Sequence, residues 1–89
     1  MTSYVKVCED VGKEDQTIEL PTEDDQTLLL STLASQFSGA SGLRFRIASE
    51  GNIRGVKLQE SKLYPPNGSW NEITYYCVFP KGRLKYYST

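Results

Sequence analysis

Only one segment of this chain spaces its apolar residues as an amphipathic helix does. These residues recur three or four positions apart, at Leu30, Leu33, Ala34 and Phe37. They would form a single apolar stripe along one helix face. Elsewhere, apolar and polar residues alternate over short runs, which is the spacing of half-buried strands. One helix among several strands predicts an α+β fold, because a lone helix must bury its stripe against a sheet.

The alternating runs define the expected strands. They cover residues 4–8, 17–20, 43–47, 53–59 and 73–79. The first two runs are predicted to form one hairpin and the next two a second. Gly55 within the fourth run predicts a bulge or a close backbone approach. The last run is apolar or aromatic on both faces, so we expect it in the middle of the sheet.

The start of the helix is marked less sharply than its apolar stripe. Thr22, with Asp25 three residues later, resembles a capping box, while Asp25 or Thr27 could equally be the N-cap. A helix that begins between Thr22 and Thr27 includes Leu28. This leucine lies about 200° around the helix axis from Leu30, so we expect it to point away from the core.

The order hairpin, helix, hairpin and last central strand is typical of a ubiquitin-like β-grasp. We therefore expect a mixed sheet of five to six strands packed on one α-helix. A ferredoxin-like RNA recognition motif is the alternative, but it needs a second helix after the third strand. Residues 61–72 contain two consecutive prolines and favour at most a short extended piece at 62–64. Residues 1–80 are expected to form the domain, and residues 81–89 a polar, basic tail or the start of a linker.

The residue types that most enzymes and metal sites require are scarce. The chain has no histidine, and its two cysteines, Cys8 and Cys77, lie far apart in the sequence. Both cysteines sit in apolar runs and are expected to be buried free thiols. No phosphate-binding glycine loop, membrane-spanning run or signal peptide is present. We expect an intracellular protein without catalytic activity, cofactor, metal or small-molecule ligand.

Charge is distributed unevenly along the sequence. Residues 1–27 hold eight acidic residues and two lysines, a net charge of −6, whereas residues 28–89 have a net charge of +5. If folding separates the two signs, one copy could attract another. The alternative, that the signs interleave in space and cancel, is equally consistent with the sequence. The first surface is expected to be acidic and consists of Glu19, Glu23, Asp24 and Leu28. An apolar residue set within a charged rim is typical of a small interface.

The second surface is basic and supports two interpretations. Its residues are Arg44, Arg46, Arg54 and Lys57. It could meet the acidic surface of another copy. It could instead bind single-stranded nucleic acid, with Tyr86 and Tyr87 stacking on bases. The net charge of −1 makes the second interpretation the weaker one, because dedicated nucleic-acid binders are basic.

Three segments together resemble the N-terminal domain of the TAR DNA-binding protein family. They read LPTEDDQTLLLSTLASQFSGASGLRFR, IRGVKLQE and LYPPNGSW. The resemblance implies a ubiquitin-like fold related to the polymerising DIX domains, and homotypic head-to-tail association. It also implies a nuclear protein, with shuttling to the cytoplasm, that acts in splicing and RNA stability. RNA would be bound by domains outside this chain.

The family pattern carries over to particular positions. The resemblance implies an acidic side formed by Glu19 and Glu23, with Gln36 nearby, and a basic side formed by Arg54 and Lys57. Three positions depart from that pattern. Gln16 replaces an acid, Lys57 replaces an arginine, and Glu50 stands where the family often has a serine. Two residues are also inserted in the first turn, so the contact is expected to be weaker or re-paired here.

Overall fold

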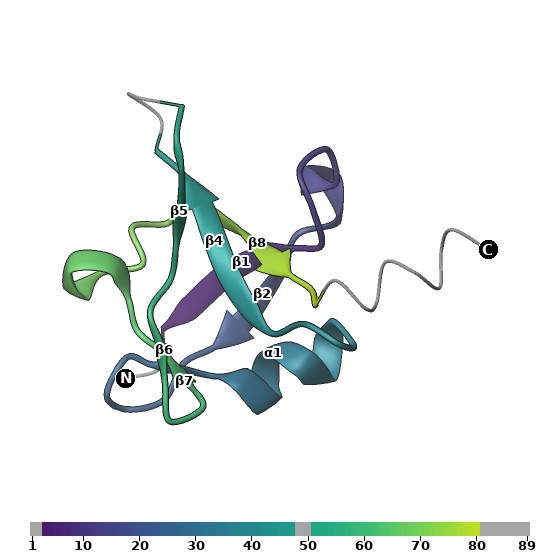
Figure 1. The fold of residues 1–89 in the computed structure, drawn as a ribbon. Helices are drawn as coiled ribbons and strands as arrows, with labels where there is room; N and C mark the ends of the chain where they lie inside the picture. The colour runs from purple at the N-terminus through teal and green to yellow at the C-terminus, as the bar shows by residue number, and fades with distance from the viewer. Residues whose placement is uncertain (1–2, 48–50, 81–89) are drawn as a thin grey trace.

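The computed structural model describes residues 3–47 and 51–80 and contains two β-sheets and one α-helix (Figure 1). The larger sheet has five strands in the order β2-β1-β8-β4-β5. Their bounds are β1 Tyr4–Cys8, β2 Ile18–Pro21, β4 Gly42–Arg46, β5 Ile53–Gly55 and β8 Thr74–Val78. β1 and β8 pair in parallel, whereas the other neighbours are antiparallel. The expected mixed sheet, with the last strand at its centre, is confirmed.

The smaller sheet has three strands in the order β3-β7-β6. Its strands are β3 Leu28–Leu29, β6 Leu58–Gln59 and β7 Lys62–Leu63. The helix α1, Leu30–Gln36, follows β3 directly. The described residues also include two short 3₁₀ helices, η1 Glu14–Gln16 and η2 Pro66–Gly68. Residues 61–72 therefore form a strand and a 3₁₀ turn, not the second helix that the RNA recognition motif alternative requires. The α+β class and a ubiquitin-like arrangement hold for the described residues.

The core lies between the inner face of the large sheet, the helix and the small sheet. Its fully buried side chains include Tyr75, Leu28, Leu33, Leu43, Leu63, Val5 and Val7. The alternation of β1 and β4 turns Val5, Val7, Leu43 and Phe45 inward and leaves both arginines of β4 exposed, as predicted. Cys8 and Cys77 are buried free thiols, which confirms that prediction.

The predicted start of the helix was wrong. The carboxylate of Asp25 accepts hydrogen bonds from the Thr27 backbone N–H at 3.1 Å and from the Thr27 hydroxyl at 2.6 Å. Gln26 between them has a left-handed φ of 73°. This local Asx-type turn replaces the expected first helical turn, since the Asp25 side chain satisfies the backbone there. Leu28 then pairs with Leu63 in the small sheet, and the helix begins at Leu30.

The predicted fourth strand is interrupted after Gly55. β5 ends at that glycine, and the chain crosses to the small sheet, where it continues as β6. A Cβ placed on Gly55 would meet nothing within 4 Å, so no close backbone approach explains the glycine. Among the described residues, no helix is long and apolar enough to span a membrane.

Candidate functional site

The acidic residues singled out by the sequence lie at one edge of the large sheet. Glu19 is exposed on β2, the edge strand, and Glu23 is exposed in the turn that follows this strand. The Glu23 N–H donates to the Thr27 carbonyl at 2.8 Å, which closes the turn. Gln36 is the exposed last residue of α1, a helix that packs against β2. We call Glu19, Glu23 and Gln36 the acidic edge.

Leu28 does not belong to this edge, and its expected surface position was wrong. Its side chain is 0% exposed and is part of the core. The expectation assumed helical geometry, in which Leu28 and Leu30 point in opposite directions. Because Leu28 is instead in a strand opposite Leu63, it points into the layer between the two sheets. Of the three consecutive leucines, Leu28 and Leu29 form β3 and Leu30 begins α1, and the fully buried Leu28 is not available to an interface.

The basic residues lie at the other edge of the same sheet. Arg54 is exposed on β5, opposite Phe45 of β4. Lys57 follows in the crossing to the small sheet, and its ammonium lies 5.5 Å from the centre of the Tyr64 ring, within the range of a cation–π contact. Both residues line a hollow of about 270 Å³ with Tyr64 and Pro65. We call Arg54 and Lys57 the basic edge.

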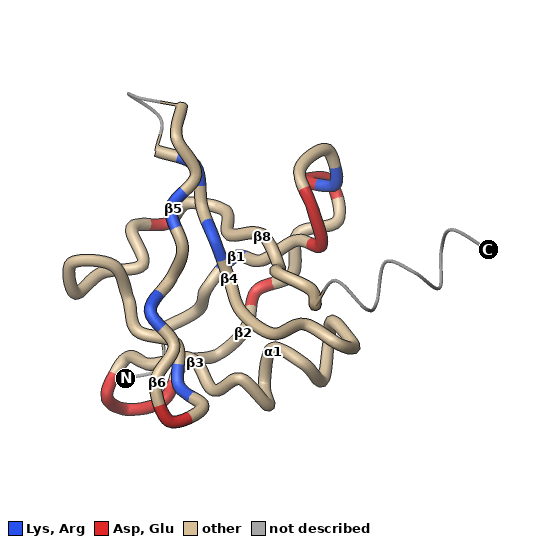
Figure 2. The backbone as a smooth tube through the Cα atoms, viewed as in Figure 1, with Lys and Arg blue, Asp and Glu red and all other residues tan. Residues whose placement is uncertain are grey.

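Glu19 and Arg54 are too far apart to neutralise one another within a single molecule. Four strand spacings separate β2 from β5, about 19 Å at the usual interstrand distance. This exceeds the screening length of about 8 Å at physiological salt. Figure 2 shows basic residues in blue on β4 and β5 and an acidic segment in red on β2, the strand that contains Glu19. None of the charged residues of either edge makes an ion pair within the described part of the chain.

On the outer face of the large sheet, in contrast to Glu19 and Arg54 at its edges, positively and negatively charged side chains lie next to one another. The Arg44 guanidinium lies 3.8 Å from the carboxylate of Asp10, and Arg46 donates to the Gly51 carbonyl at 3.4 Å. Arg44 and Arg46, the candidates for nucleic-acid contact, therefore have partners within the chain. Glu50, which was predicted at the basic self-association face, and Tyr86 and Tyr87, which were predicted to stack on bases, lie outside the described residues.

The first loop carries its acids onto this outer face. The Tyr76 hydroxyl on β8 donates to the Glu14 carboxylate at 2.8 Å, which lowers the pKa of Glu14 and raises that of Tyr76. The Cys8 thiol, 3.4 Å from the Asp10 carbonyl, is covered by the same loop, and this burial raises its pKa. The outer face therefore matches the alternative of local cancellation, whereas Glu19 and Arg54 lie on opposite edge strands.

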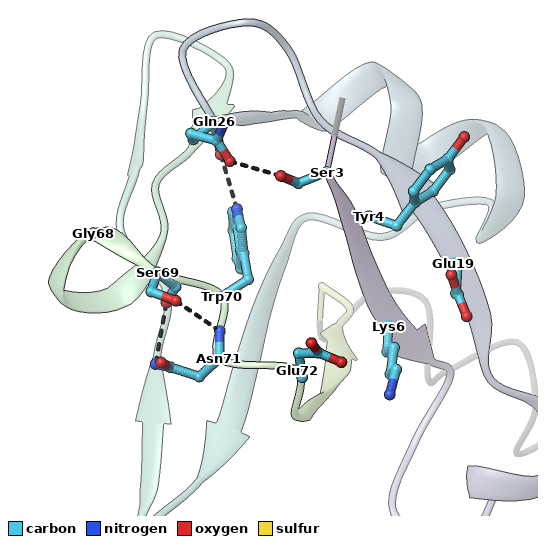
Figure 3. Close-up of a pocket in the computed structure, with 10 residues that line it drawn as sticks. All are labelled: Ser3, Tyr4, Lys6, Glu19, Gln26, Gly68, Ser69, Trp70, Asn71 and Glu72. Carbon is cyan, nitrogen blue, oxygen red and sulfur yellow. Dashed lines mark hydrogen bonds between the residues drawn. The ribbon is translucent and has the colours of Figure 1, made fainter. Parts of the chain in front are cut away.

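Sequence reasoning missed a hollow that adjoins the acidic edge (Figure 3). It has a volume of about 520 Å³ and lies between β1, β2 and the loop that precedes β8. Its charged lining residues are Lys6, Glu19 and Glu72. The predicted hairpin carried no register, so the pairing of Lys6 with Glu19 is known from the structure alone, and no sequence signal places Glu72 there. Groups of metal-binding residues are absent from the part of the chain that the structure describes.

Comparison with known proteins identifies the family. Residues 4–79 match the family described as "TAR DNA-binding protein 43, N-terminal domain". This chain belongs to that family. The match covers all eight strands and the helix, so it applies to the whole described fold.

One curated relative extends the family assignment. The "Tar DNA-binding protein homolog 1" of Caenorhabditis elegans is 36% identical over 66 residues, which cover 72% of this chain. The chain spans only 16% of the length of that relative. The TAR DNA-binding protein N-terminal domain is therefore one part of a longer relative.

Proposed function

We propose that this domain associates with copies of itself head to tail, with the acidic edge of one copy bound to the basic edge of the next. The observation that supports this most directly is the placement of Glu19 and Arg54 on opposite edge strands, each without an ion pair among the described residues. Two unlike surfaces on one molecule favour a heterologous contact. Each copy then keeps one edge free, so that the assembly grows as an open chain.

The contact is expected to be weak and reversible. Exposed ion pairs contribute up to about 1 kcal/mol each, and association itself costs several kcal/mol. Lys57 adds a point charge, not the planar fork that an arginine offers a carboxylate. Leu28 is buried, so the apolar side chains that remain to strengthen the contact are the exposed ones on β1, β2 and β5, namely Tyr4, Ile18 and Ile53. We therefore expect a Kd of about 1 μM or weaker, corresponding to about −8 kcal/mol or a less favourable free energy.

We also infer that the parent protein binds nucleic acid through parts outside this chain. The family description and the name of the relative both refer to DNA binding, and the relative is far longer than this domain. In our proposal the parent is a nuclear RNA-binding protein of splicing and RNA stability, and self-association of this domain sets its local concentration on RNA.

Sedimentation velocity tests the self-association. At low salt, the weight-average sedimentation coefficient should rise with protein concentration and fall again when salt is added. Glu19→Arg and Arg54→Glu should each abolish growth of the chains, because each variant lacks one edge. An equimolar mixture of the two variants should associate again, because one pair of edges is intact and the two reversed charges also attract each other. A mixture of Glu19→Arg with Arg54→Ala, which leaves the reversed charge at position 19 without a partner, should form dimers and nothing longer. A boundary that stays monomeric at every concentration contradicts the proposal.

A further inference from the structure

The hollow beside the acidic edge holds three charged side chains that come from three segments. Lys6 is on β1, Glu19 on β2, and Glu72 in the turn before β8. In Figure 3 they lie in a row with Lys6 in the middle. Glu19 and Glu72 are exposed, and none of the three makes an ion pair within the described residues.

Lys6 changes the electrostatic balance of the acidic edge. It pairs directly with Glu19 across the β1–β2 ladder, so both side chains stand on the same face of the sheet, about 5 Å apart at Cβ. A lysine at this distance offsets most of the attraction that Glu19 alone exerts on an incoming cation. The hollow is net negative only because Glu72 adds a second carboxylate.

The backbone brings Glu72 to this position. Asn71 and Glu72 have left-handed φ values of 58° and 54°. The turn is held by hydrogen bonds between Ser69 and Asn71 at 3.1 and 3.2 Å. The adjacent Trp70 is buried, so the turn is anchored to the core. Glu72 is therefore presented by a fixed segment that is distant in sequence from every residue of the acidic edge.

We propose that Glu72 is a further residue of the self-association surface, and that it binds Arg54 of a second copy together with Glu19. This inference rests on the proposed head-to-tail contact. Arg54 fits because a planar guanidinium presents five N–H donors and can bond two carboxylates at once. Tyr4, which is 58% exposed and lines the same hollow, offers a ring face on which the guanidinium can stack.

A defined heterodimer tests Glu72 without the complication of growing chains. The Arg54→Ala variant retains its acidic edge, the Glu19→Arg variant retains its basic edge, and isothermal titration of one with the other measures a single contact, because alanine cannot pair with the reversed charge at position 19. Glu72→Gln placed in the Arg54→Ala copy should weaken the Kd by about threefold to fivefold at low salt. The same substitution in the Glu19→Arg copy should leave the Kd unchanged, because the acidic edge of that copy is not used.

Two further variants sharpen the test. Lys6→Gln in the Arg54→Ala copy should tighten binding by about twofold to threefold, since it removes a cation beside the carboxylates. Glu60→Gln is the matched control: Glu60 is an exposed glutamate with a left-handed φ of 53°, but it does not line the hollow. Glu60→Gln, placed in the same copy as Glu72→Gln, should leave the Kd of the heterodimer unchanged.

The outcomes separate this inference from the proposed function. If the two titrated variants bind each other and Glu72→Gln has no effect in either copy, the proposed role of Glu72 is wrong and head-to-tail association stands. If Glu72→Gln weakens binding equally in both copies, its effect is on the fold and the inference also fails. If the two titrated variants do not bind each other even without Glu72→Gln, the proposed function itself is overturned.

Discussion

The indole N–H of Trp70 donates to the backbone carbonyl of Gln26 at 2.8 Å. This hydrogen bond joins the loop that carries Glu72 to the turn that carries Glu23. The two bonded residues are 44 positions apart in the sequence. The Trp70 carbonyl in turn accepts the Tyr75 hydroxyl at 2.8 Å, and the two rings meet edge to face at 5.3 Å. One buried side chain therefore anchors both acidic segments to the centre of the sheet.

Replacing Trp70 by phenylalanine should destabilise the domain. The substitution leaves the Gln26 carbonyl without its donor, at a cost of about 1–3 kcal/mol, and adds a loss of packing because part of the ring volume is removed. Urea denaturation followed by far-ultraviolet circular dichroism measures the free energy of unfolding. Tyr76→Phe is a control that removes an exposed hydrogen bond to Glu14, and it should cost no more than about 1 kcal/mol. Equal effects of both substitutions would contradict the anchoring role.

Replacing Leu28 by alanine should lower stability, not remove an interface contact. The side chain is fully buried, and truncating a leucine in such a position costs about 2–5 kcal/mol. Leu58→Ala offers a comparison at a position that is 43% exposed, where we expect a change of about 0.5 kcal/mol or less. Urea denaturation of both variants, read against sedimentation of the folded fraction, distinguishes the two roles. If Leu28→Ala left the free energy of unfolding unchanged but abolished self-association, Leu28 would be an interface residue and not a core residue.

The sequence predicted most of the large sheet because its alternation depends on burial on one face. Val5, Val7, Leu43 and Phe45 could be assigned to the core directly, and the doubly apolar last strand could be placed at the centre. The charge split along the sequence left open whether the two signs would separate or interleave, and only the strand order places Glu19 and Arg54 on the two edge strands.

The errors arose where a side chain overrides local periodicity. Asp25 closes a turn on Thr27 that competes with the start of the helix, and the pairing of Leu28 with Leu63 depends on a strand 35 residues away. Glu72 could not be recognised for a related reason. Its position follows from left-handed backbone geometry and from the anchoring of Trp70, neither of which leaves a periodic signal.

The Asp25 turn should make stability depend on pH in the acidic range. Hydrogen bonds from the Thr27 hydroxyl and N–H, with a smaller contribution from Lys62 at 3.3 Å, lower the pKa of Asp25 from 3.8 to about 2. Because the folded state favours the ionised form, this stabilisation is complete above about pH 4 and is lost as the pH falls toward 2. The stability gap between the wild type and Asp25→Asn should therefore narrow over this interval.

Urea titrations at several pH values, followed by Trp70 fluorescence, measure this gap. Glu14, whose pKa is also lowered, titrates in both proteins and cancels from the comparison. A gap that stays constant down to about pH 2 would show that the Asp25 carboxylate gains nothing from the turn.

The outer face of the sheet should bind nucleic acid only weakly. Arg44 is engaged with Asp10, and the first loop holds further acids over this face, so an incoming phosphate meets both signs of charge. A labelled single-stranded oligonucleotide titrated at physiological salt should show little binding. Asp10→Asn should increase binding at low salt, because it frees Arg44, and Arg44→Gln should reverse that gain. Tight binding by the wild type that Arg44→Gln abolishes would make this face a nucleic-acid site in its own right, independent of the two edges.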